Sequence, residues 1–376
     1  MAQPESHPDL ARLMEAGIAG GVFPGGALLV RVRGKTVHLS FHGRRSLEPP
    51  GDPVDAHTCF DLASLTKVLV TTPLVLHSIL RGRLELETPL HRLLEECAGQ
   101  GREAITVRML LNHSSGLAGW RPYYERVRSA DGEIRPATVK GQEAVRRMVA
   151  AEAPEALPGS RALYSDLNFI LLDWILERVN GYSTDVLFAE WLAEPLKLES
   201  LFFVDLKSPV KAARARRGRA FAATERCPWR GRILIGEVHD ENCYAMGGVS
   251  GHAGLFGTIG DVAAMADAWL DSFLCSDGFF EQGLAKQFWQ KSEVPGSTRA
   301  LGFDTPSPGA SQAGGLFGPR TVGHLGFTGT SLWIDPDREL IVVLLTNRVH
   351  PTRENGAITQ FRPMLHERVA ELCVNR

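Results

Sequence analysis

A serine and a lysine three residues apart, Ser64 and Lys67, are the residues of this chain best suited to covalent chemistry. A serine hydroxyl is a weak nucleophile near neutral pH unless a neighbouring base takes its proton. The apolar sequence around the pair predicts an extended segment that turns into a helix at Ser64. Residues three apart on a helix lie on the same face, about one turn from each other. We therefore expect an amine beside the hydroxyl, with a pKa lowered by burial and by the helix dipole.

The Ser-x-x-Lys spacing occurs twice, and the context separates the two pairs. With 21 serines and 8 lysines in 376 residues, chance placement gives about 0.4 such pairs. The second pair, Ser208 and Lys211, encloses Pro209 in an arginine-rich stretch, which indicates an N-cap serine followed by proline at the first helical position. Ser64 has apolar neighbours and compatible motifs downstream. The alternative for Ser64 and Lys67 is also a helix cap, with a solvated lysine.

Tyr164 and Asp166 follow Ser64 by about one hundred residues. The phenol of Tyr164 could accept or relay a proton if a nearby cation such as Lys67 lowered its pKa. Taken alone, Tyr164 would indicate a core residue with a satisfied hydroxyl. Asp166 is compatible both with a helix N-cap and with a contact to substrate, because its carboxylate accepts hydrogen bonds in either role.

A glycine-rich segment at residues 323–330 leads into an expected strand and contains His324, Gly326 and Phe327. Glycine lets the backbone approach a ligand closely. The edge of a strand also offers free N–H groups to a substrate carbonyl. This segment is therefore a candidate for binding the carbonyl that a nucleophile attacks.

Strand patterns occur at both ends of the chain, and helix patterns fill the middle. This distribution predicts an α+β fold, in which an antiparallel sheet built from both termini is flanked by helices and carries an inserted, mainly helical domain. We expect residues 1–75 and 240–376 to form the sheet domain, residues 76–239 the helical domain, and the active site to lie at their interface. The expected strands are 27–33, 36–42, 331–334 and 340–346; the expected helices are 8–18, 64–80 (kinked or divided at Pro73), 107–111, 142–152, 168–179, 262–274 and 357–373.

Composition and charge exclude some classes of partner. The net charge of −2 gives no general attraction to nucleic acid or to an anionic membrane. Residues 207–232 carry nine Lys and Arg against one Glu, but without a nucleic-acid-binding motif they indicate a solvated insertion. The sequence has neither a signal-peptide pattern nor an apolar run of about 18 residues. We expect a cytoplasmic protein, although an exported form with its signal removed would have the same sequence.

A metal site at residues 239–242 and His252 is a weaker hypothesis. The segment His-Asp-Glu-Asn contains ligand types, but the spacing His-Glu-x-x-His is absent and adjacent residues rarely point at one ion. We expect a polar loop near the mouth of the site and no cofactor or metal. The motif Gly-x-Ser-x-Gly is also absent, since residues 248–252 end in histidine, which argues against an α/β-hydrolase.

Taken in order, these motifs resemble those of the serine β-lactamase and penicillin-binding-protein family, most closely class C β-lactamases and the related esterases and D-amino-acid peptidases. Ser64 to Lys67 matches the S-x-x-K of that family, residues 164–166 stand where it has Y-x-N, and residues 324–326 stand where it has K-T-G or H-x-G. The segments 110–117, 251–258 and 326–336 are similar to the same family. The resemblance runs from about residue 20 to the C-terminus.

The resemblance implies a role for each position and a β-lactamase/transpeptidase-like fold. Ser64 would attack a carbonyl and form an acyl-enzyme, Lys67 and Tyr164 would share the general-base work, and the N–H groups of Ser64 and Phe327 would form the oxyanion hole. Asp166, His324 and Gly326 would lie along the substrate. Water would then release the acid.

Two departures from the family pattern concern the substrate. Asp166 replaces an amide, and an ionised carboxylate cannot donate a hydrogen bond to the substrate. Asp166 could hold Lys67 charged, which would move the role of base toward Tyr164. It could instead attract a cationic group of the substrate. His324 replaces a lysine, and a neutral imidazole binds a carboxylate less well. We therefore expect a metal-independent serine hydrolase of esters, amides or small D-amino-acid peptides. The alternatives are a penicillin-binding or sensor protein that acylates without efficient turnover, and a metallohydrolase at His239 and His252. The only partner expected is a small-molecule substrate, and the sequence leaves the oligomeric state open.

Overall fold

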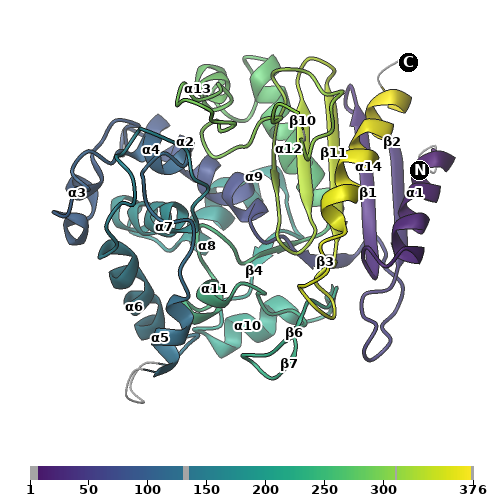
Figure 1. Ribbon diagram of the computed structural model, residues 1–376, viewed down its shortest axis with the longest axis horizontal. Helices are drawn as coiled ribbons and strands as arrows, with labels where there is room; N and C mark the ends of the chain where they lie inside the picture. The colour runs from purple at the N-terminus through teal and green to yellow at the C-terminus, as the bar shows by residue number, and fades with distance from the viewer. Residues whose placement is uncertain (1–6, 130–134, 310, 374–376) are drawn as a thin grey trace.

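A five-stranded antiparallel sheet built from the two ends of the chain is the frame of the molecule (Figure 1). The computed structural model describes residues 7–129, 135–309 and 311–373. The strand order is β2-β1-β11-β10-β9, so the N-terminal hairpin pairs with C-terminal strands. The strands are β1 (Gly25–Val32), β2 (Lys35–Gly43), β9 (Val322–Leu325), β10 (Ser331–Asp335) and β11 (Leu340–Thr346).

Both faces of this sheet are covered by helices. Side chains alternate between the faces of a strand, so Leu28 and Val342 pack under α1 (Pro8–Ala19) and α14 (Ile358–Cys373). The alternate residues, such as Leu29 and Val343, belong to the main core with α12 (Ile259–Leu274) on the opposite face. Figure 1 shows α14 in front of the strands and α12 behind them. Burial on both faces explains why residues 27–30 of β1 and 340–345 of β11 are continuously apolar rather than alternating.

Helices and short strands form the part of the molecule beside the sheet (Figure 1). The helices are α2 (Thr72–Leu80), α3 (Leu90–Leu93), α4 (Val107–Leu111), α5 (Tyr123–Ser129), α6 (Val139–Ala150), α7 (Asp166–Asn180), α8 (Thr184–Phe188), α9 (Glu194–Leu196), α10 (Pro209–Arg216), α11 (Glu241–Ala245) and α13 (Gln282–Phe288). The short strands are β3 (Thr58–Asp61), β4 (Phe202–Phe203), β5 (Ala220–Phe221), β6 (Arg226–Cys227), β7 (Arg232–Ile233) and β8 (Leu255–Gly257).

The predicted mixture of helices and antiparallel sheet is confirmed, whereas the division into residues 1–75 with 240–376 and residues 76–239 stays a prediction. Among the residues that the structure describes, no helix is long and apolar enough to cross a membrane.

The helix that follows Ser64 is divided next to Pro73, as one of the two expected solutions. A wide π-helical turn, Lys67–Thr71, precedes α2, and Pro73 lies in the first turn of α2. A proline cannot donate the hydrogen bond of an ordinary helical turn. The wider turn changes the bonding pattern just before the proline, and such turns are frequent at functional sites.

The second Ser-x-x-Lys pair forms the helix cap that its sequence predicts. Ser208 is the N-cap of α10, its Oγ accepts a hydrogen bond from the backbone N–H of Lys211 at 3.4 Å, and Pro209 opens the helix. The two pairs therefore differ in structure as they differ in context.

A buried ion-pair cluster joins α6 to α7, the helix that starts at Asp166. The Arg146 guanidinium lies 2.6 Å from Asp173 and 2.6 Å from Glu177, and the Arg146 and Asp173 side chains are 9% and 0% exposed. Removing the cation leaves two carboxylates without their partner in a low-dielectric site.

Arg146→Met is therefore expected to lower the free energy of unfolding by about 3–5 kcal/mol, measured by urea unfolding. Arg178→Met is the matched control, because Arg178 pairs with Glu96 with 37% of its side chain exposed; an exposed pair contributes about 1 kcal/mol or less. Equal losses of unfolding free energy in the two variants would contradict the conclusion that Arg146 neutralises buried carboxylates.

Candidate active site

Ser64 is presented by a tight turn between β3 and the following helix. Ala63 has a left-handed backbone (φ +47°), a conformation that costs a non-glycine residue free energy. Asp61 compensates, because one carboxylate oxygen accepts the Ala63 N–H at 2.9 Å and the other accepts the His239 N–H at 2.6 Å. The turn leaves Ser64 partly exposed at the start of the helix.

The structure brings Ser64, Lys67 and Tyr164 together. Lys67 Nζ lies 2.9 Å from Ser64 Oγ, and Tyr164 Oη lies 2.8 Å from the same oxygen. The amine reaches Ser64 from one helical turn away, and the phenol comes from the segment just before α7. A serine oxygen that faces an amine and a phenol at these distances can pass its proton to either group once that group has lost its own proton.

Lys67 is fully buried and holds three partners. Besides Ser64 Oγ, its Nζ contacts the His252 carbonyl at 2.9 Å and Asp166 Oδ1 at 2.8 Å. Burial alone lowers the pKa of Lys67, but the carboxylate of Asp166, and then Tyr164, outweigh burial, so the pKa is raised. The expectation of a lowered pKa was wrong, because it considered only burial and the helix dipole.

Tyr164 rests as a phenol. Burial raises its pKa, and although the Lys67 ammonium lowers it, Asp166 opposes that effect and the net direction is upward. His113 helps to hold the phenol in place, since its Nδ1 accepts the Ser165 N–H at 3.1 Å and its ring lies 4.8 Å from the Tyr164 ring. The sequence around His113 predicts a residue of a helix-end turn with no catalytic role, and it does not indicate this contact, which spans more than fifty residues.

The glycine-rich segment forms a turn that is tied to the nucleophile. Gly326 N–H donates to the Thr330 carbonyl at 2.7 Å, and the hydroxyls of Thr328 and Thr330 donate to the carbonyls of Asp61 (2.7 Å) and Leu62 (3.1 Å). A Cβ at Gly326 would lie 1.9 Å from Thr330 Oγ1, so only glycine fits at this position.

His324 is a neutral imidazole. Burial, followed by the nearby cations of Lys67 and Arg299, lowers the pKa of His324 well below its ordinary value. Its Nδ1 lies 2.8 Å from the Leu325 carbonyl, which can only accept a hydrogen bond, so Nδ1 carries the proton. The buried Nε2 is left without a partner among the described residues.

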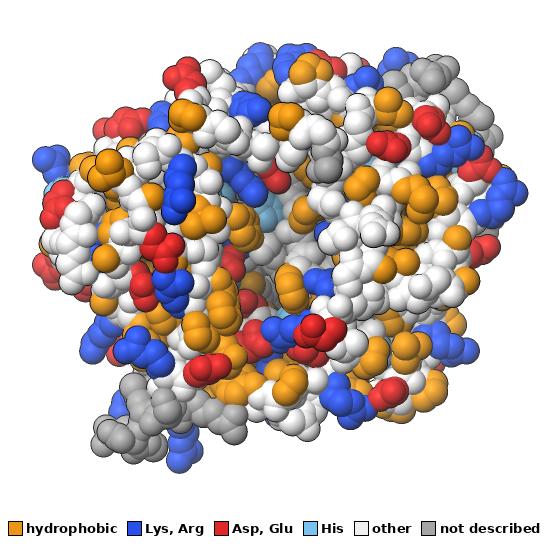
Figure 2. All heavy atoms as spheres, viewed as in Figure 1, with side chains coloured by type: hydrophobic (Ala, Val, Ile, Leu, Met, Phe, Trp, Pro, Cys, Tyr) orange, Lys and Arg blue, Asp and Glu red, His pale blue; other side chains and the backbone are white. Residues whose placement is uncertain are grey.

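Two cavities meet at Ser64, where Figure 2 shows the surface hollowed. The larger, about 510 Å³, is bordered by Asp166 and the 239–241 loop, and the smaller, about 310 Å³, by Arg299 and His324. Phe327, with 51% of its surface exposed, lines both. The structure thus places all seven predicted site residues at or beside one cleft: Ser64, Lys67, Tyr164, Asp166, His324, Gly326 and Phe327.

The two histidines of the alternative metal site already have protein partners. His239 Nε2 lies 3.1 Å from Glu225, and His252 lies between Ser250 Oγ (2.8 Å from Nδ1) and Asp240 Oδ1 (3.0 Å from Nε2). The ring of His239 stacks against Phe327 with centroids 5.6 Å apart. These contacts support a polar loop that borders the cleft and fixes the His252 carbonyl beside Lys67.

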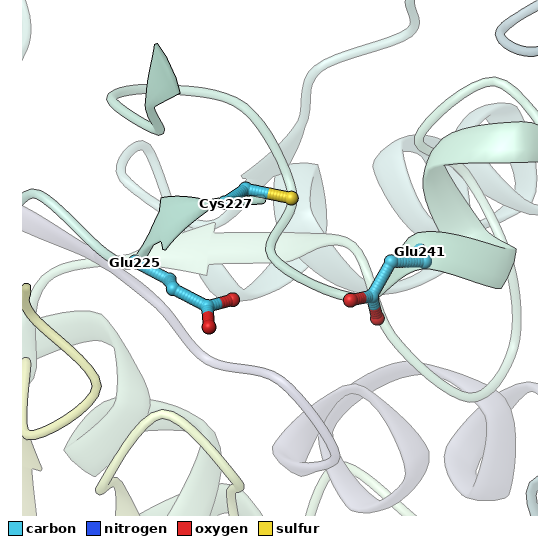
Figure 3. A group of neighbouring side chains, drawn as sticks. All are labelled: Glu225, Cys227 and Glu241. Carbon is cyan, nitrogen blue, oxygen red and sulfur yellow. The ribbon is translucent and has the colours of Figure 1, made fainter. Parts of the chain in front are cut away.

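Glu225, Cys227 and Glu241 form a second cluster of ligand types beside the cleft (Figure 3). Arg353 occupies this cluster: its Nε lies 2.8 Å from Glu225 Oε1, and its Nη2 bonds Glu241. A guanidinium that holds both carboxylates makes the group an ion-pair network. Arg353 was absent from the sequence analysis, because the pairing spans more than one hundred residues.

The fold and this cleft define a serine hydrolase, and comparison with known proteins gives the family. The chain belongs to the Beta-lactamase family, whose model matches residues 10–362. An N-acetylmuramyl-L-alanine amidase of Bacillus subtilis (strain 168) is 30% identical over 372 residues, covering 90% of this chain and 80% of its own length.

A protein of Escherichia coli (strain K12) named "Putative D-alanyl-D-alanine carboxypeptidase" is 32% identical over 310 residues, covering 78% of this chain and 70% of its own. The solved structure of EstCE1, a hydrolase with promiscuous acyltransferase activity, shares the fold with a TM-score of 0.72 and 22% identity, over 96% of this chain and 98% of that one.

Asp166→Asn is expected to move the pH dependence of Ser64 reactivity to lower pH. The Asp166 carboxylate raises the pKa of both Lys67 and Tyr164, so its removal lowers the pKa of whichever group must lose a proton to act as base. The measurement is the rate of covalent labelling by a fluorophosphonate between pH 5 and about pH 10. Asp337→Asn, at an exposed ion pair with Arg320, is the control. A pH profile of labelling in Asp166→Asn that coincides with that of the wild type would contradict the role of Asp166 in raising the pKa of the base.

Proposed function

We propose that this chain is a metal-independent serine hydrolase that cleaves esters, amides or small D-amino-acid peptides through an acyl-enzyme. The observation that carries the proposal is the position of Ser64 Oγ, within 2.9 Å of a buried amine and 2.8 Å of a partly buried phenol at the meeting point of two cavities. A hydroxyl that only caps a helix would not need these partners.

In the proposed reaction, Lys67 or Tyr164 first releases a proton to solvent, and Ser64 Oγ then forms a bond to the substrate carbonyl carbon as its own proton passes to that deprotonated group. The carbonyl oxygen becomes an oxyanion that accepts hydrogen bonds from the N–H groups of Ser64 and Phe327. The base returns the proton to the leaving group as the carbonyl re-forms. Water then attacks the acyl-enzyme in the same way and releases the acid and Ser64.

Two residues of the cleft, His324 and Asp166, support a substrate other than a β-lactam. The neutral His324 brings no charge of its own to bind a carboxylate where related proteins have lysine, and the cations that line the same cavity are Arg299, Arg348 and Arg362. Asp166 presents a carboxylate in place of an amide, and the 239–241 loop adds more acid. The relatives are named for amidase and carboxypeptidase activities and the structural neighbour for hydrolase and acyltransferase activity. These names support an ester, an amide or a small D-amino-acid peptide.

A second candidate function is acylation without efficient turnover, as in a penicillin-binding sensor. The observation that favours a catalytically weak protein of this kind is the resting protonation of the site: Lys67 and Tyr164 both have raised pKa values, so one of them must lose its proton before it can act as base in either step. Labelling of Ser64 by a fluorescent penicillin without product release would support this candidate. Fast turnover would exclude it.

Ser64→Ala is expected to abolish hydrolysis of a chromogenic short-chain ester, because no other group in the proposal can form the acyl-enzyme, while the circular dichroism spectrum stays unchanged. The matched control is Ser208→Ala in the other Ser-x-x-Lys pair, which removes the cap of α10. It should keep the activity and lose about 1 kcal/mol of stability. Equal turnover by Ser64→Ala and the wild type would contradict the proposal.

In a panel of short esters, D-aminoacyl amides, D-Ala-D-Ala peptides and a chromogenic cephalosporin, we expect the compounds without a carboxylate to turn over best and the cephalosporin to turn over little, because His324 is uncharged. Steady-state kcat/KM for each compound, with and without a strong chelator, is the measurement. Cephalosporin turnover approaching ~10⁸ M⁻¹s⁻¹ would contradict the interpretation of His324. Loss of activity with the chelator would revive the metallohydrolase alternative.

A further inference from the structure

Two buried arginines bind the backbone carbonyls on either side of the Phe327 N–H. Arg362 Nη2 donates to the Gly326 carbonyl at 3.0 Å and to the Thr330 carbonyl at 2.7 Å. Arg348 Nε donates to the Phe327 carbonyl at 2.8 Å. Within the described part of the chain, neither guanidinium has a carboxylate within 4 Å.

Arg362 is held in an environment that disfavours its charge. The residue is 5% exposed, its Nε has no hydrogen-bond partner among the described residues, and burial, followed by the nearby Arg348, lowers its pKa to about 9. It remains a cation at neutral pH. A buried charge without a counter-ion destabilises the folded state, so a functional reason for keeping it is worth seeking.

The turn does not need Arg362 to close. Gly326 N–H already donates to the Thr330 carbonyl, and Gly329 N–H donates to the Gly326 carbonyl at 3.1 Å. The two threonine hydroxyls join the turn to the segment before Ser64. The guanidinium therefore supplies an additional, charged hydrogen bond to carbonyls that already accept one from the backbone.

The Gly326 carbonyl and the Phe327 N–H belong to the same planar peptide unit. A cation that hydrogen-bonds the carbonyl oxygen draws electron density from the amide nitrogen, so the N–H becomes a stronger donor. The bond also fixes the plane of the peptide and thus the direction of the N–H. Both effects stabilise a developing oxyanion more than a neutral carbonyl.

We propose that Arg362 is a positioning residue of the oxyanion hole, whose guanidinium orients and polarises the Gly326–Phe327 peptide so that the Phe327 N–H binds the transition state more strongly than the substrate. This inference rests on the proposed function. Arg348 restrains the next carbonyl along the chain, and its guanidinium carbon lies 4.5 Å from the centre of the Phe327 ring.

The test compares Arg362→Met with Arg102→Met. Arg102 is also buried (3% exposed) and also donates to backbone carbonyls, those of Cys97, Ala98 and Glu152, but it borders neither cavity at Ser64. Each variant is assayed for kcat and KM on the short-chain ester, for the affinity of phenylboronic acid, which forms a tetrahedral adduct with serine, and for thermal stability.

For Arg362→Met we expect kcat to fall about ten- to hundredfold, less than the ~10²–10³-fold cost of losing an oxyanion donor itself. KM should change little, and phenylboronic acid affinity should fall by the same factor as kcat/KM. Arg362→Lys, which keeps the charge, should recover part of both losses. Arg102→Met should lose stability and keep its kcat and its affinity for the boronic acid.

Unchanged kcat and phenylboronic acid affinity in Arg362→Met, in an enzyme whose activity depends on Ser64, would overturn this inference and leave the proposed function standing. Ester hydrolysis that Ser64→Ala does not reduce would overturn the proposed function itself. If Arg362→Met does not fold, Arg362→Gln decides: it keeps a neutral donor without the charge, so parallel losses support the inference and wild-type values overturn it.

Discussion

The buried contact between Lys67 and Asp166 is the interaction on which the chemistry of this cleft depends. Lys67 is completely enclosed, and an enclosed amine without an anion would lose its proton. With Asp166 at 2.8 Å the amine stays charged, and its remaining protons point at Ser64 and at the His252 carbonyl. The charge state of the whole site is thus decided by a carboxylate one hundred residues away from the serine.

Much of the fold could be predicted because its causes are local. The apolar runs of β1, β10 and β11, and the helical patterns of α1, α12 and α14, reflect side chains that alternate or repeat along one segment. The cap at Ser208 is also local, because it depends only on a serine followed by a proline at the first helical position. The wide turn before Pro73 was not predicted, because a proline in a helical pattern has several structural solutions and the sequence does not choose among them.

The residues of the site could largely be predicted from the sequence, whereas most of their partners in distant segments could not. The motifs indicated Ser64, Lys67 and Tyr164, and their resemblance to a family indicated His324 and Phe327. The sequence also offered Asp166 as a group that could hold Lys67 charged, and the structure pairs the two. The support of Tyr164 by His113 and the guanidiniums of Arg353 and Arg362 depend on pairings between distant segments that no motif indicated. A pattern within one segment carries no information about such pairings, and electrostatic effects in a buried site are set by them.

The threonine hydroxyls that link the 326–330 turn to Asp61 and Leu62 affect how the cleft loses its structure on heating. They connect the turn after β9 in the large sheet to the segment after β3. The backbone N–H groups of Ser64 and Phe327 are therefore held in place together. Local fraying of either segment would have to break these links, which disfavours it. We therefore expect heat inactivation to follow the separation of the large sheet from the nucleophile helix.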